Sequence, residues 1–74
     1  MTTFIVSKEE FHKEAKIFFD NLPTLNEEQA ENGLKALGLL YLGVEDINDR
    51  ELNECAMVYR IATRKVFEKL LSVV

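Results

Sequence analysis

The last third of the sequence constrains the fold most strongly, because residues 49–74 contain neither proline nor glycine. Apolar side chains recur there every three or four positions, which is the period of one face of an α-helix. We therefore predict one long helix over about 49–73, and a helix that is apolar along one face needs other elements to cover it. The predicted core stripe consists of Leu52, Cys55, Tyr59, Ala62, Val66, Leu70 and Val73.

An earlier segment carries signals that begin and end a helix. Ser7 is followed by Glu10, the S-x-x-E pattern of a capping box at a helix N-terminus. Pro23 disfavours helical geometry at the residue before it, so the helix should end at about residue 21. These signals predict a helix over about 8–21. Its apolar face consists of Phe11, Ala15, Phe18 and Leu22, and Ile17 and Phe19 widen that face.

Residues 26–42 are predicted to form the second helix. Two capping boxes, Thr24 with Glu27 and Asn26 with Gln29, are equally consistent with its start. Gly43 follows the last residue, and we expect it to adopt the left-handed conformation that closes many helices. The main apolar face consists of Ala30, Leu34, Leu37 and Tyr41, whereas Leu39, Leu40 and Leu42 fall outside it.

The third helix should begin near Asp49, because Asn48 with Glu51 again has the spacing of a cap and its partner. Short loops make sequential helices antiparallel neighbours. We therefore predict one all-α domain over 1–74, a small three-helix arrangement in which a helical hairpin is joined to a long C-terminal helix. Residues 2–6 are β-branched and aromatic, as in a short extended arm, but five residues alone form no sheet, so we assign them to coil.

Composition and targeting signals narrow the class of protein. A chain of 74 residues buries only about 60% of the surface it exposes when unfolded, so its core is small. The longest nearly apolar run, residues 36–44, is far shorter than the ~20 residues of a membrane span. A single cysteine and an N-terminus without an export signal favour a reducing, cytoplasmic location.

The apolar surface exceeds what three short helices need for one core. Apolar residues lie beside the core stripe of the last helix and outside the main face of the second helix. Either the last helix is covered on two sides within the monomer, or the surplus binds a partner, and we favour a partner. The expected occupant is another protein or a second copy of the chain, as a homodimer or hetero-complex, and we expect the chain to self-associate. The candidate partner-binding residues are Leu39, Leu42, Met57, Arg60, Ile61, Arg64, Phe67, Leu71 and Val74.

Charge is distributed unevenly along the chain, whose net charge is −4. Residues 27–54 hold two bases and eight acids, whereas residues 55–74 hold four bases and one acid. The acidic balance disfavours nucleic-acid binding, which needs a local excess of Lys and Arg. We expect an adaptor, small chaperone or regulator. The alternatives are a transcription-associated regulator that uses the basic C-terminal helix, and an acidic inhibitor that mimics nucleic acid.

No residue pattern predicts catalysis, a cofactor, a small-molecule substrate or a metal ion. The segment 46–57 superficially resembles a calcium loop, but Arg50, Glu51 and Met57 occupy positions that need an oxygen ligand, a glycine and a glutamate. His12 has no second histidine, and Cys55 falls on the core stripe, where a free cysteine behaves as a small hydrophobe. We therefore predict a non-enzymatic protein in which His12 lies on the surface and is not paired with Cys55.

Overall fold

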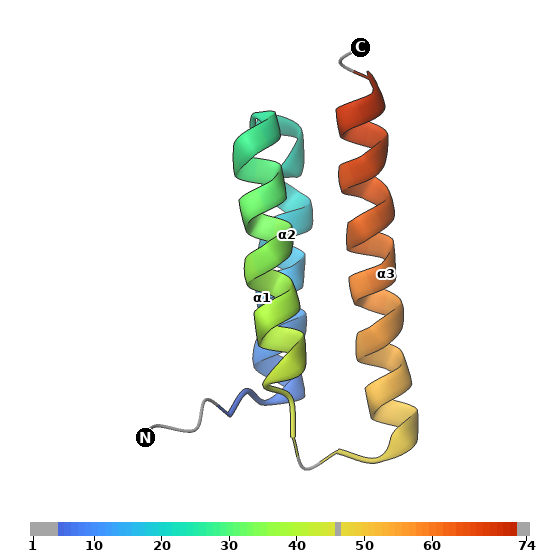
Figure 1. Cartoon of the computed structure of the whole chain (residues 1–74). Coiled ribbons are helices and arrows are strands. Elements are labelled where there is room, and N and C mark those ends of the chain that lie inside the picture. The colour runs from blue at the N-terminus through green and yellow to red at the C-terminus, as the bar shows by residue number, and fades with distance from the viewer. Residues whose placement is uncertain (1–4, 46, 73–74) are drawn as a thin grey trace.

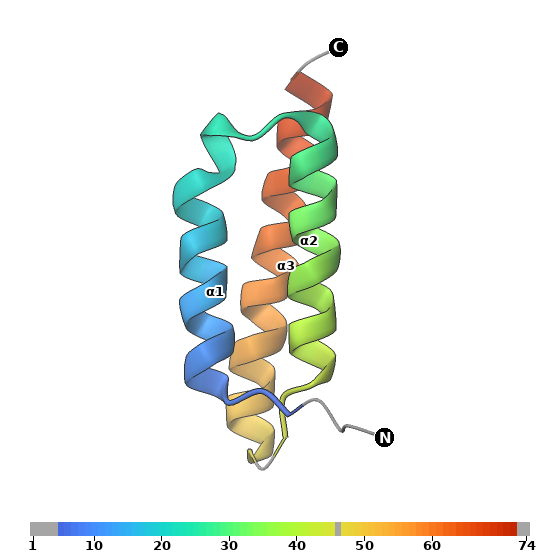
Figure 2. The same cartoon turned by 90° about the vertical axis from the view of Figure 1, so that its left-hand side faces the viewer.

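The computed structural model describes residues 5–45 and 47–72, which form three helices packed side by side (Figures 1 and 2). Helix α1 spans Lys8–Asn21, a 3-10 turn η1 covers Leu22–Thr24, α2 spans Glu27–Leu42 and α3 spans Asp49–Ser72. The predicted all-α, three-helix fold is confirmed, and the predicted helix bounds agree closely. The predicted end at Val73 lies outside the described residues.

The helix starts follow the predicted caps, with one difference. The Ser7 hydroxyl accepts a hydrogen bond from the backbone N–H of Glu10 at 3.1 Å, but Glu10 does not complete the box. At α2 the box is complete, because the Asn26 side chain accepts from Gln29 N at 2.8 Å and the Gln29 side chain accepts from Asn26 N at 3.0 Å. The structure therefore selects Asn26 over Thr24 as the cap of α2.

The helix ends show where local expectation fails. Pro23 ends α1 as predicted, and the chain continues as the short turn η1. Gly43 was expected to be left-handed, but its φ is −86°, so that prediction is wrong. Its N–H bonds to the carbonyls of Leu39 and Leu40, which continues the helical pattern by one residue. The direction of the chain after α2 is set instead by contacts that Gly43 and Val44 make with the N-terminal segment.

That segment is Ile5–Val6, the described part of the predicted arm; residues 2–4 lie outside the described residues. The N–H of Val6 donates to the carbonyl of Gly43 at 2.9 Å, and Val6 forms an isolated parallel bridge with Val44. Figure 2 shows the segment crossing the end of the bundle at which α1 begins and α2 ends. Val6 is 1% exposed, so the arm belongs to the core although it forms no extended strand.

The core lies where the three predicted apolar faces meet. Its members share near-complete burial and are Val6, Phe11, Ala15, Phe18, Leu22, Ala30, Leu37, Cys55, Ala62 and Val66. Leu34, Tyr41, Tyr59 and Leu70 pack against this core and are half-buried. Leu52, predicted at the start of the α3 stripe, is exposed instead.

Two glycines let the helices of the bundle approach closely. A Cβ placed on Gly33 of α2 would lie 2.5 Å from Phe18 Cε1 of α1, and one on Gly38 would lie 2.9 Å from the Tyr59 hydroxyl of α3. Both contacts are shorter than packed atoms tolerate, so each glycine makes room for an aromatic side chain of a neighbouring helix. Helix α2 is thus fitted to α1 on one side and to α3 on the other.

Candidate functional site

Large apolar side chains of α2 and α3 remain at the surface of the bundle. Leu42 is 77% exposed and Leu71 is 71% exposed, and a side chain at that level contacts little of its own protein. The exposed members of the predicted set are Leu39, Leu42, Met57, Ile61, Phe67 and Leu71, and Arg60 and Arg64 are exposed with them. Val74, the remaining predicted residue, lies outside the described residues.

The exposed residues of α3 do not all share one side of that helix. Tyr59 marks the side that faces α2, because it packs against Gly38 and stacks on Tyr41. At 100° per residue, Phe67, Arg60 and Leu71 lie about 80–120° round the helix from Tyr59. Met57 and Ile61 lie about 160° from it, on the outer side of α3. The predicted set therefore splits into residues beside α2 and residues that face away from the bundle.

A shallow groove lies between α2 and α3 at the level of Tyr59. Its volume is about 620 Å³, and its lining is mostly apolar. We call this hollow the α2/α3 groove; it is lined by Lys35, Gly38, Leu39, Tyr41, Leu42 and Tyr59. Leu39 and Leu42 thus share one hollow, as predicted residues on neighbouring turns of α2 should.

The floor of the groove is a pair of tyrosines that the sequence placed in the core. The rings of Tyr41 and Tyr59 are parallel within 4°, with centroids 5.7 Å apart. Both residues are half-buried, and within the described part of the chain neither phenol hydroxyl makes a hydrogen bond. Glycine at position 38, opposite a large residue, was the available sequence signal, because it lets Tyr59 lie against α2.

The apolar surface of α2 continues on its other side. A second hollow, between α1 and α2, is lined by Glu14, Ile17, Phe18, Asn21, Leu25, Gly33, Ala36, Leu37 and Leu40. Ala36, Leu39, Leu40, Leu42 and Gly43 line a further depression on the outside of α2. Residues 36–42 of α2 thus carry no charged side chain, and both sides of this part of the helix present apolar surface. Ile17, Ala36 and Leu40 were not among the predicted site residues.

The four bases of residues 55–72 of α3 lie on different sides of the helix. Lys65 and Lys69 line a hollow beside Phe19 and Pro23, and the Lys69 ammonium donates to the Pro23 carbonyl at 3.5 Å. By the same helical period, Arg60 lies on the side nearer α2, whereas Arg64 lies closer to the outer side. The basic charge of α3 is therefore not one continuous surface.

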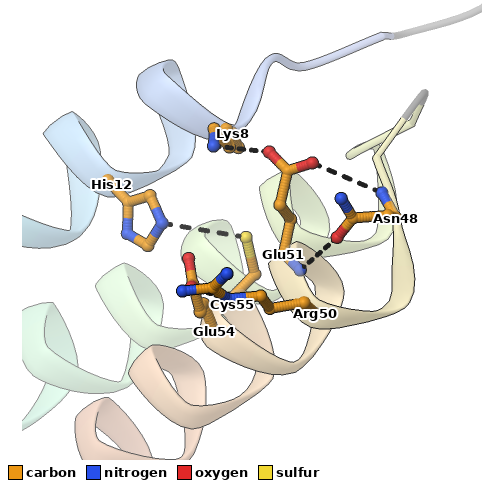
Figure 3. Close-up of polar contacts among 7 residues, drawn as sticks. All are labelled: Lys8, His12, Asn48, Arg50, Glu51, Glu54 and Cys55. Carbon is orange, nitrogen blue, oxygen red and sulfur yellow. Dashed lines mark hydrogen bonds and ion pairs between the residues drawn. The ribbon is translucent and has the colours of Figure 1, made fainter.

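A polar cluster joins the first turns of α1 and α3 (Figure 3). The Glu51 carboxylate forms an ion pair with the Lys8 ammonium. It also accepts a hydrogen bond from the backbone N–H of Asn48 at 3.4 Å. The Lys8 hydrogen bond, more than any other contact, lowers the pKa of Glu51 and, reciprocally, raises the pKa of Lys8. These contacts fix the start of α3 against the start of α1.

Beside this cluster, His12 Nε2 lies 4.0 Å from Cys55 Sγ, and His12 is half-buried, so the two side chains are in contact although no catalytic pair between them was predicted (Figure 3). Helical geometry explains the contact, because both residues project into the seam between α1 and α3. Cys55 is fully buried, and burial raises the pKa of its thiol. A reactive cysteine needs a lowered pKa and access to solvent, so the geometry favours packing over nucleophilic chemistry.

Two further classes of site were tested on the described residues. Within 5–45 and 47–72, no group of three or more His, Cys, Asp or Glu side chains is placed to hold a metal ion. Among the same residues, none of the helices combines the length and the apolar character needed to cross a bilayer. The exposed apolar surface of α2 and α3 is therefore the feature on which a function is argued.

Comparisons with known proteins add no assignment to this geometry. No family model matches the chain, no curated protein matches it, and no solved structure matches it. The functional argument therefore rests on the chain's own residues.

Proposed function

We propose that this protein is a non-enzymatic protein-binding module, an adaptor, small chaperone or regulator, that acts through the exposed surface where α2 and α3 meet. We call this surface the α2/α3 face; it consists of Leu39, Leu42, Tyr59, Arg60, Phe67 and Leu71. The observation that carries the proposal is the exposure of Leu39 and Leu42 in the lining of the α2/α3 groove, with Phe67 and Leu71 exposed farther along α3. Such patches on globular proteins mark interaction sites.

The energetics support an apolar interface on this face. Fully burying a leucine or phenylalanine side chain gains about 1.5–3 kcal/mol relative to leaving it in water. Leu39, Leu42 and Phe67 would each contribute on that scale, although the entropy lost on association offsets part of the gain. Arg60 lies at the edge of the face, where a charged group sets orientation more than affinity. A free thiol at Cys55 suits a reducing compartment such as the cytoplasm.

The test is site-specific photo-crosslinking in the cells that produce the protein. Leu42 is replaced by p-benzoylphenylalanine in one variant, and exposed Lys13 on the outer side of α1 is replaced by it in the control. We expect discrete protein adducts from position 42 and none from position 13. Equal labelling from both positions, or no adduct from position 42, would overturn the proposal.

The exposure of Arg60 and Arg64 favours one second function, contact with nucleic acid through α3. Counterion release makes such binding fall steeply with salt, whereas an apolar interface responds little. Fluorescence anisotropy of a labelled DNA duplex, titrated with the protein at low and high salt, separates the two. Tight binding that is lost at high salt and in Arg64→Glu would establish the second function in place of the first.

A further inference from the structure

We infer that the α2/α3 groove binds a short amphipathic helix of another protein, one whose apolar residues are flanked by acids. This inference rests on the proposed function and narrows it from a protein-binding face to the chemistry of one partner. The charge around the groove is opposite in sign to the net charge of the chain. The whole protein carries −4, yet the charged residue that lines the groove is Lys35.

The opposite rim of the groove carries the same sign of charge. Arg60 follows Tyr59 on α3 and lies about 100° round the helix from it, on the side nearer α2, whereas Arg64 lies about 140° from Tyr59, toward the outer side. Lys35 and Arg60 are both exposed, and within the described residues neither of them forms an ion pair. An apolar floor with unpaired cations on both sides complements an apolar helix face with acids on both flanks.

The floor of the groove offers polar contacts of the matching kind. The hydroxyls of Tyr41 and Tyr59 have no hydrogen-bond partner within the described residues, and each can donate to a carboxylate or a backbone carbonyl. Tyrosine combines a large apolar ring with one donor, which is why it is frequent in binding surfaces.

The ends of the groove limit the length of the partner. From Leu42 to Lys35 is two turns of α2, about 10 Å at 1.5 Å per residue. Beyond Lys35 the same side of α2 continues with Glu31 and Glu28, which are exposed and would repel acids. The docked segment is therefore about two turns long, with apolar anchors at positions i, i+3 or i+4, and i+7.

A second copy of the chain is the competing occupant of the groove. If two copies met through this face with their α2 helices parallel, Glu28 and Glu31 of each copy would lie together and repel. An antiparallel arrangement would separate these acids, so self-association is an outcome that the experiment must detect, and its detection would contradict the inference.

The experiment is selection from a random library of helical peptides, followed by binding measurements on the full chain. Peptides displayed on phage are selected against the immobilised protein, and the enriched sequences are synthesised with a fluorescent label. We expect leucine or aromatic anchors at helical spacing with glutamate or aspartate beside them. Enriched peptides without acids, or the recovery of no peptide, would overturn the inference.

Matched variants then locate the bound peptide by fluorescence anisotropy. Leu42→Glu should weaken binding at least about tenfold and Lys35→Glu at least about fivefold, because each places a carboxylate against an acidic ligand. Ile17→Glu and Lys13→Glu are the controls, since both positions are exposed but lie outside the groove. Equal loss in the controls would refute the site.

The crosslinking experiment distinguishes failure of the acidic-partner inference from failure of the proposed function. Adducts with another protein at position 42, together with selected peptides that are basic or neutral, would leave the binding module standing and remove its acidic partner. Adducts between two copies of the chain would likewise remove the acidic partner. The absence of adducts from position 42 would remove both proposals.

Discussion

The two long seams of α3 are built differently. Toward α1 and η1, polar contacts cross the seam, namely Lys8 with Glu51, His12 with Cys55 and Lys69 with the Pro23 carbonyl. Toward α2, the described residues make no hydrogen bond or ion pair across the seam, and the contact is apolar, with Tyr59 of α3 packed against Gly38 and Tyr41 of α2. Polar contacts fix the position of α3 against α1, whereas the apolar seam with α2 has a mostly apolar groove along its surface.

The largest expected effect on stability comes from a comparison of two phenylalanines. Phe11 is fully buried at the α1 side, and Phe67 is 59% exposed at the α2 side. Phe11→Ala should cost about 3–5 kcal/mol in the free energy of unfolding, and Phe67→Ala about 0.5 kcal/mol or less. Urea unfolding followed by circular dichroism measures both.

Because the domain is small, Phe11→Ala can abolish folding altogether, so Phe11→Leu serves as the milder variant. It keeps most of the apolar volume and should lie between the wild type and the alanine variant. A large loss of stability in Phe67→Ala would mean that the α2/α3 face belongs to the fold and is not a binding surface.

A smaller test compares the two glycines of α2. Gly33→Ala places a methyl group against the buried ring of Phe18, so overpacking of about 1–3 kcal/mol should exceed the gain of about 1 kcal/mol in helix propensity. Gly38→Ala meets the outer end of the Tyr59 ring, at 2.9 Å from the hydroxyl and 3.3 Å from Cζ, and this end can move toward solvent, so stability should change by less than about 1 kcal/mol. Thermal and urea unfolding of both variants gives the comparison, and an equal cost would show that α2 is packed as rigidly against α3 as against α1.

The smallest expected effect concerns the ion pair between Lys8 of α1 and Glu51 of α3. The lowered pKa of Glu51 means that its contribution to stability is present above the carboxyl's ordinary pKa and is lost as pH falls through the folded-state value. The raised pKa of Lys8 means that its contribution is lost only as pH rises above the ordinary lysine value. Glu51→Gln should therefore lower the urea midpoint at pH 7 and have no effect at pH 2.

Glu14→Gln is the matched control, because Glu14 is exposed on α1 and forms no ion pair within the described residues. It should leave the urea midpoint unchanged at both pH values. If Glu51→Gln also left the urea midpoint unchanged at pH 7, the ion pair would not stabilise the contact between α1 and α3.

The fold followed from sequence wherever a signal was local. The Ser7 and Asn48 caps, the position of Pro23 and the apolar period placed all three helices. Local signals failed at Gly43, because its conformation depends on the distant segment at Val6. They also left the choice between Thr24 and Asn26 open, since both boxes satisfy the same spacing.

The candidate surface was predictable only in part. Periodicity showed that residues such as Leu39 and Phe67 fall outside the core stripes, and they are exposed. It could not show which exposed residues share one side of the bundle, because that depends on how each helix is rotated against its neighbours. The same limit hid the stacked tyrosines of the groove and the contact of His12 with Cys55.

The bridge between Val6 and Val44 has a consequence for the order in which the chain folds. It joins two segments that are far apart in sequence, so its loop-closure entropy is large until α1 and α2 have already come together. We therefore expect it to form after the transition state for folding, when the hairpin has brought its ends into register. Contacts that form this late slow unfolding without accelerating folding, and so the arm prolongs the lifetime of the native state.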